Sequence, residues 1–214
     1  LNMFNNRLSL TTDFYIRDTK GILGKGKSLP SIYGASEPQM NANNLRTKGY
    51  ELVLGWRDSF KLAGSTFSYG ITGTFSDYTA EYTKCDNPTG LIGDPYVGKK
   101  YGEIWGYKVD GLFRNDKEAA EYASRIDLST VASGYYTATG AYGKGVRGGD
   151  IKYLDLNGDN IVNGGKGTLD DPGDRRVIGN SSPRYQYGAS LNFSWYGFDV
   201  SVFMQGIGRL DWYP

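Results

Sequence analysis

The residues most suggestive of chemistry are three oxygen-bearing side chains spaced two apart, Asp155, Asn157 and Asp159. Oxygen donors at positions 1, 3 and 5 are typical of an EF-hand loop, in which position 7, here Ile161, contributes its carbonyl oxygen. Position 6 is usually Gly, and Asn160 stands there; Asn tolerates a left-handed turn better than most residues. Because hard oxygen donors suit Ca²⁺ and suit zinc poorly, the spacing predicts a structural Ca²⁺ site at the base of a loop.

The last ligand of this predicted site has several candidates. An EF-hand loop has a bidentate Glu at position 12, but Lys166 occupies that position, so the loop departs from the standard length. Residues 164–173 have the character of an insertion, and the carboxylates available in and beyond it are Asp170, Asp171 and Asp174. The alternative interpretation is a turn without a metal, since Asp and Asn favour turns in any case.

The composition excludes several other kinds of reactive centre. The 214 residues include no His, which removes His-based acid–base catalysis, Ser–His and Cys–His nucleophiles and His-ligated zinc. The single cysteine, Cys85, allows no internal disulfide. With 24 basic and 23 acidic residues and no basic tract, the chain gives no reason to expect a nucleic-acid partner. A carboxylate pair such as Glu103 and Asp110 could serve a glycoside hydrolase, but such pairs are common by chance.

An aromatic-rich stretch at residues 101–113 is the candidate contact surface for a substrate or partner. We expect it to form short strands or an ordered loop, followed by a helix-like stretch at residues 117–125. Trp105, Tyr107 and Phe113 could stack on a sugar ring. The alternative is that these three rings pack the loop onto its neighbours.

The elements that position these residues are β-strands. Five segments alternate between apolar and polar residues with a period of two, which predicts strands near residues 5–17, 48–57, 65–78, 184–195 and 198–206. Each apolar face spans about the 9–11 residues that a tilted strand needs to cross a bilayer. Aromatic residues stand at the ends of these faces, where the interfacial girdles of membrane barrels lie: Tyr50, Trp56, Tyr185 and Trp195.

The predicted connections alternate in length. Long loops at residues 18–47 and 81–183 alternate with short turns near 58–64 and at 196–197. Outer-membrane barrels have long external loops and tight periplasmic turns, so the predicted fold class is all-β, a transmembrane antiparallel β-barrel segment. Five strands are too few to close a barrel, and we expect further strands and a secretion signal outside these residues. No run reaches the roughly 18 apolar residues of a membrane helix.

Six stretches, in order along the chain, resemble the SusC/RagA family of TonB-linked outer-membrane proteins. They are LSLTTDFYIRDT (8–19), NLRTKGYELVL (44–54), GEIWGYKVDGLF (102–113), GDIKYLDLNGD (149–159), RVIGNSSPRYQY (176–187) and GFDVSVFMQG (197–206). Thr47 departs from the family pattern, which usually has Asn there. The family also has an Asp just before its R-x-V-I-G motif, so the resemblance favours Asp174 over Asp170 and Asp171 as the last metal ligand.

The resemblance implies that residues 1–214 are part of the C-terminal barrel domain of a multi-pass protein of the bacterial outer membrane. Such a barrel has about 22 strands and a plugged lumen, and the plug domain and remaining strands would lie outside this chain. It implies import of glycan or peptide fragments, driven by TonB through an N-terminal region. A SusD-type lipoprotein would cap the outer mouth, and membrane lipid would surround the barrel. No enzymatic activity, catalytic residue or organic cofactor is expected.

Two other functions compete with transport. The first is a soluble, secreted, calcium-binding β-sandwich module that binds glycans; alternating strands fit it equally well, and it predicts a fragment that folds in water without detergent. The second is the glycoside hydrolase, which an activity screen on diverse oligosaccharides would reveal.

Overall fold

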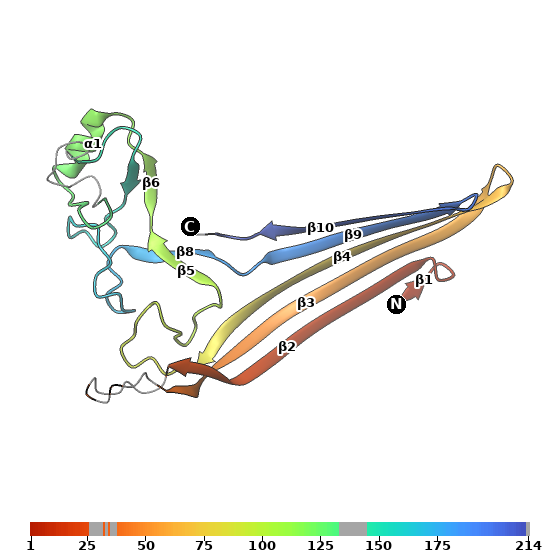
Figure 1. Cartoon of the computed structure of the whole chain (residues 1–214), viewed down its shortest axis with the longest axis horizontal. Helices are drawn as coiled ribbons and strands as arrows, with labels where there is room; N and C mark the ends of the chain where they lie inside the picture. The colour runs from red at the N-terminus through yellow and green to blue at the C-terminus, as the bar shows by residue number, and fades with distance from the viewer. Residues whose placement is uncertain (26–31, 33, 35–37, 133–144, 213–214) are drawn as a thin grey trace. The chain divides into compact units, whose positions relative to one another are not determined.

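The computed structural model describes residues 1–25, 32, 34, 38–132 and 145–212, which form two compact units (Figure 1). The first unit comprises Leu1–Asp86, Val97–Gly102 and Asn180–Pro214, and the second comprises Asn87–Tyr96 and Glu103–Gly179. In the described part of the chain, no helix has the length and apolar character needed to span a membrane.

The first unit is a six-stranded antiparallel sheet in the order β1-β2-β3-β4-β9-β10. Figure 1 shows the five long strands running side by side. The strand bounds are β1 Asn2–Met3, β2 Leu8–Lys25, β3 Gln39–Leu62, β4 Ser65–Lys84, β9 Arg184–Trp195 and β10 Phe198–Arg209. The pairing of β4 with β9 joins two strands that are far apart in the sequence.

Four of these strands extend beyond the predicted bounds, and β10 does so by three residues, to Arg209. β2 and β3 extend through much of the predicted loop 18–47, and β4 continues to Lys84. The reason is that the prediction followed apolar residues, whereas the backbone ladder continues through polar ones. Asp18 and Arg46, for example, face each other on β2 and β3, and the guanidinium donates hydrogen bonds of 2.7 and 3.0 Å to the carboxylate. Residues 26–31, 33 and 35–37 of that loop, and 133–144 of the loop 81–183, lie outside the described residues.

Two predicted boundaries at the turns are also corrected. The short connection expected near residues 58–64 is only Ala63–Gly64, because β3 reaches Leu62. The first long strand begins at Leu8 rather than at residue 5. The three residues with left-handed backbone that form the preceding turn are Phe4, Asn5 and Asn6. A strand cannot continue through this conformation, since positive φ lies outside the β region.

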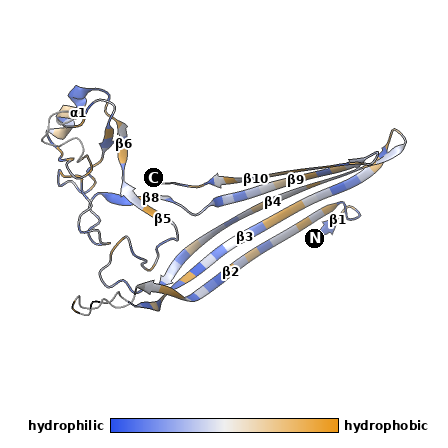
Figure 2. Ribbon diagram, viewed as in Figure 1, coloured by the Kyte–Doolittle hydropathy of each residue, from blue (hydrophilic) through white to orange (hydrophobic). Residues whose placement is uncertain are grey.

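The strand register aligns the apolar residues of all five long strands on one face. One row across the sheet is Leu8, Trp56, Ile71, Leu191 and Val202, and the neighbouring row on the other face is Ser9, Gly55, Thr72, Ser190 and Phe203. Side chains alternate between faces, so one face is mainly apolar and the other is mainly small and polar, with exceptions such as Val53 and Phe203. Figure 2 shows that apolar residues lie in the middle part of β3, with mostly hydrophilic ones toward its ends.

The apolar face is not the inside of a two-sheet core. Ile71 at its centre is 45% exposed, and Phe14 is 79% exposed. A β-sandwich would bury such residues between its sheets. The first unit therefore presents an apolar surface to whatever surrounds it.

Both tight turns at one end of the sheet have left-handed backbone at two positions, Ala63–Gly64 and Tyr196–Gly197. This is the conformation of two-residue hairpin turns whose twist matches that of the strands. The Tyr196 hydroxyl donates a hydrogen bond to the Ala63 carbonyl, and the Trp195 indole donates one of 3.3 Å to the Leu62 carbonyl. The two neighbouring hairpins are thereby tied together at their turns.

An ion pair holds β9 to β4 at the other end of their seam. The Arg184 guanidinium donates hydrogen bonds of 2.5 Å to both oxygens of the buried Asp77 carboxylate, across 107 residues of sequence. The Tyr185 amide donates a further bond of 3.3 Å to the same carboxylate. Removing one member of such a buried pair leaves an uncompensated charge, which is strongly destabilising.

The second unit contains a small core of its own. Its elements are β5 Glu103–Tyr107, β6 Val109–Leu112, α1 Asp116–Ala123, β7 Ile151–Tyr153 and β8 Arg175–Asn180, with β5 paired to β8 and β6 to β7. The Asn115 side chain caps α1 by accepting a hydrogen bond from the Glu118 amide. The buried residues of this core are Phe113, Ala119, Leu128, Ala132, Val146 and Val162.

Candidate functional site

The predicted metal-binding loop follows β7 in the second unit and is built from side-chain-to-backbone hydrogen bonds. The two Asp155 oxygens accept bonds from the amides of Gly158 and Asn160, at 2.7 and 2.8 Å. Asn157 accepts from the Asp159 amide at 3.0 Å, and Asp159 accepts from the amide two residues later at 2.8 Å. Asn160 has a φ of 65°, the left-handed backbone expected at this position. The first three predicted ligands therefore lie in one tight turn.

Asp174 lies at the centre of this loop and is fully buried. One carboxylate oxygen accepts hydrogen bonds from the amides of Leu156 and Asn157, at 2.7 and 3.3 Å. The other accepts from the Asn163 amide at 2.8 Å. Three backbone donors thus compensate the buried charge, and the carboxylate clamps the loop to the segment that leads into β8.

The same carboxylates that could bind a cation are hydrogen-bonded to the backbone of the loop. Within residues 1–25, 32, 34, 38–132 and 145–212, no group of three or more His, Cys, Asp or Glu side chains could hold a metal ion together. The Asp155 and Asp159 carboxylates accept from their own turn, and Asp174 accepts from three backbone amides. The predicted donor set, which also includes Asn157 and the Ile161 carbonyl, forms an Asp- and Asn-rich turn held by these hydrogen bonds.

The aromatic residues proposed as a contact surface pack inside the second unit. Phe113 is 1% exposed, and its ring centroid lies 5.6 Å from that of Tyr122. The prediction that Phe113 touches a substrate or partner is wrong, because the core covers its ring completely. The Tyr107 ring meets the Tyr153 ring edge to face at 6.0 Å. The Trp105 indole is half-buried and donates a hydrogen bond of 2.8 Å to Glu103.

The carboxylates considered for acid–base chemistry belong to two separate clusters. Glu103 accepts from the Tyr96 hydroxyl as well as from Trp105; burial, together with this bond, raises the pKa of Tyr96 to about 12. Asp110 lies 3.1 Å from the Lys152 ammonium, which is also 3.3 Å from Glu118. Each carboxylate is engaged by groups that stabilise the fold, and nothing unites the two as a catalytic pair.

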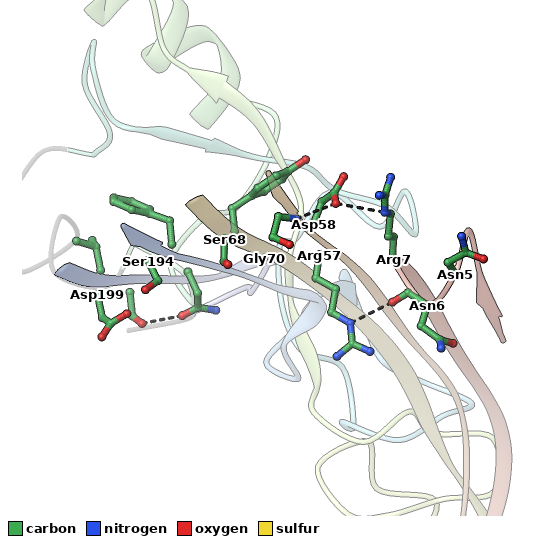
Figure 3. Close-up of a pocket in the computed structure, with 15 residues that line it drawn as sticks. Asn5, Asn6, Arg7, Arg57, Asp58, Ser68, Gly70, Ser194 and Asp199 are labelled. Carbon is green, nitrogen blue, oxygen red and sulfur yellow. Dashed lines mark hydrogen bonds and ion pairs between the residues drawn. The ribbon is translucent and has the colours of Figure 1, made fainter. Parts of the chain in front are cut away.

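A hollow on the polar face of the first unit is the feature that sequence reasoning missed (Figure 3). It has a volume of about 640 Å³ near the tight turns. Its floor is made of small residues from neighbouring strands, Ser68, Gly70 and Ser194, with Arg57 and Asp199 among its rim residues. The Arg57 guanidinium donates a hydrogen bond of 3.0 Å to the Asn6 carbonyl. Small residues can be read from the sequence, but only the strand register shows that they gather.

Comparison with known proteins was made by sequence and by structure. No family model matches the chain. Two curated proteins of Formosa agariphila match: TonB-dependent receptor P39 is 26% identical over 220 residues, and TonB-dependent receptor P3 is 24% identical over 216 residues. The alignments cover 94% and 95% of this chain but 20% and 19% of those proteins. The chain thus spans about a fifth of the length of the curated relatives it matches.

Two solved structures share the fold. One is described as the RagAB peptide transporter, with a TM-score of 0.56 and 17% identity over 95% of this chain and 19% of that chain. The other is the RagAB peptide importer in its "closed-closed" state, with a TM-score of 0.55 and 18% identity over 96% of this chain and 20% of that chain.

The clamp at Asp174 leads to a test of local stability. Replacing Asp174 with Ala removes the acceptor of the Leu156, Asn157 and Asn163 amides, at about 1–3 kcal/mol for each amide that stays shielded from water. We expect hydrogen exchange at residues 155–163 of the full-length protein to accelerate by several orders of magnitude. Asp170→Ala, an exposed neighbour, is the control and should leave exchange unchanged. Equal protection in both variants would show that Asp174 does not hold the loop.

The likeness extends over nearly the whole chain in both comparisons, as the six sequence motifs do. It also agrees with an antiparallel sheet that is apolar on one face and polar on the other. The chain is therefore similar to a segment of the TonB-dependent receptors, and it has the fold of an outer-membrane β-barrel segment of the SusC/RagA type, as its motifs predicted.

Proposed function

We propose that the chain is part of a TonB-dependent importer of the outer membrane, in which the five long strands cross the bilayer. The observation that carries this proposal is the exposed apolar face, which continues across β2, β3, β4, β9 and β10. A lipid-facing barrel wall requires such a face, together with a polar face toward the lumen. The relatives with transport names support the same role.

We propose that this segment does no covalent chemistry. Its half-buried and buried carboxylates are engaged in hydrogen bonds and ion pairs that stabilise the fold, and its relatives are named as receptors and transporters. Energy would come from TonB through a region outside this chain. A SusD-type lipoprotein would cover the outer mouth; the paired naming of the RagAB structures is in line with a partner of that kind.

The cargo we propose is a glycan or a peptide fragment. The family resemblance allows both, and the structural relatives are described as peptide transporters. The secreted β-sandwich is less well supported, because its core would require the apolar face to be buried. Phe113 no longer counts toward a glycan-stacking surface, and the polar hollow is a more open candidate for contact with passing cargo.

The membrane assignment is tested by placing the same charge on either face of β4. Ile71→Arg puts a charge on the apolar face, at about 2–4 kcal/mol near the bilayer midplane, and should reduce the heat-modifiable, outer-membrane form of the full-length protein. Thr72→Arg, one residue on, faces the lumen and should assemble normally. A full-length wild-type protein that fractionates as a soluble periplasmic or secreted species would refute the importer.

The import function is tested in a strain that lacks the full-length protein. We expect this strain to lose growth on one class of nutrient, either oligopeptides or oligosaccharides, and to recover when the gene is restored. A surface lipoprotein should co-purify with the protein from detergent-extracted outer membrane. Unchanged uptake of both classes would argue against nutrient import even if the barrel is correctly inserted.

Calcium binding at Asp155, Asn157, Asp159, the Ile161 carbonyl and Asp174 stays a proposal. Motif spacing supports it, whereas the hydrogen bonds to the carboxylates argue for a turn that needs no metal. If Ca²⁺ binds, adding it to metal-free full-length protein should slow hydrogen exchange at residues 155–163, and Asp159→Asn should weaken the effect. Identical exchange in Ca²⁺ and in chelator would rule out a structural ion.

A further inference from the structure

Two continuous rows of aromatic rings cross the apolar face of the first unit. The row nearer the long loops, here the loop-side belt, links four strands through ring centroids 6.0–6.5 Å apart, with members Phe14, Tyr50, Phe75 and Tyr185. The row nearer the tight turns, the turn-side belt, has centroids 5.3–6.3 Å apart and contains Phe60, Phe67, Tyr69 and Phe193. Aromatic rings of this kind prefer the boundary between hydrocarbon and headgroups.

The distance between the belts matches the thickness of a membrane band. Ten residues separate Tyr50 from Phe60 along β3, and eight separate Phe67 from Phe75 on β4 and Tyr185 from Phe193 on β9. At about 3.3 Å per residue this is roughly 26–33 Å along the strands. A strand tilt of about 40° reduces it to about 20–25 Å, comparable to the height of the apolar band in outer-membrane barrels. The side chains on this face between the belts include Leu52, Leu54, Ile71, Leu191 and Val202.

Outside the loop-side belt the same face changes from apolar to charged. The next row in the register contains Ile16 and Lys48, and the row after it contains Arg46 between Asp18 and Glu81, with Arg46 paired to Asp18. Lys20 lies two residues beyond Asp18 on β2. The Lys20, Arg46 and Lys48 side chains are exposed, and the Lys48 ammonium has no ion-pair partner in the part of the chain that is described. Lys48 thus lies one row outside the loop-side belt, and Arg46 and Lys20 lie further out.

With the hydrocarbon core between the two belts, as the membrane assignment implies, we propose that Lys48, assisted by Lys20, binds phosphate-bearing headgroups of the outer leaflet. The proposal rests on the membrane assignment above. A lysine in this position lays its aliphatic stem along the apolar face and extends its ammonium to the headgroup level. Each such cation strengthens the affinity for an anionic lipid surface about fivefold.

The depth of the belts is measured by spin labels on the full-length protein in lipid vesicles. Cys85→Ser, with any cysteine outside residues 1–214 also replaced, provides a background without native cysteine, into which Leu52→Cys or Asp18→Cys is introduced. The label at position 52 should be accessible to oxygen and protected from a water-soluble relaxing agent, and the label at position 18 should show the reverse. A position 18 label as deep as the position 52 label would overturn the band, even in a protein that still fractionates with the membrane.

The headgroup contact is measured by the preference of the protein for spin-labelled phosphatidylglycerol over phosphatidylcholine in phosphatidylcholine vesicles. We expect wild type to prefer the anionic lipid and Lys48→Gln to lose about fivefold of that preference. Lys166→Gln removes an equally exposed cation from the second unit and should have no effect. An unchanged preference in Lys48→Gln, or the same loss in both variants, would refute the headgroup contact and leave the importer assignment intact.

Discussion

The antiparallel register is the constraint on which the rest of the first unit depends. Inside a bilayer, each backbone N–H and C=O must find its partner on a neighbouring strand, because no water is present to replace it. A slip of one residue would exchange the two faces of a strand. Leu8, Trp56 and Ile71 share a row only because β2, β3 and β4 pair in a single register. The apolar face, the aromatic belts and the polar hollow all follow from that alignment.

Much of this sheet could be predicted from the sequence, since side-chain alternation reports directly on which face is apolar. The bounds of β9 agree with the prediction, and the apolar phases of all five long strands agree with the observed register. The ends of β2, β3 and β4 could not be predicted in the same way. There the ladder passes through polar pairs such as Asp18 and Arg46, and backbone hydrogen bonding has no sequence signature of its own.

The second unit was harder to predict because it depends on where polar and aromatic groups find partners. Trp105 and Phe113 have the same aromatic character in the sequence, yet one donates to a carboxylate and the other fills a core. The spacing of Asp155, Asn157 and Asp159 correctly indicated a tight turn with left-handed backbone at Asn160. Spacing does not say whether a carboxylate faces a cation or a set of amides, and Asp174 faces amides. That distinction requires the insertion at residues 164–173 to be folded.

The pairing of β4 with β9 places little constraint on the length of the segment that connects these two strands. Asp77 and Arg184, which are 107 residues apart in the sequence, join β4 to β9, and both residues belong to the first unit. The cost of closing a loop rises only slowly with its length, so the pairing tolerates intervening segments of very different size. The segment between the two strands can therefore differ in length among related chains while the pairing of β4 with β9 is kept. Variation in the second unit would then leave the sheet unchanged.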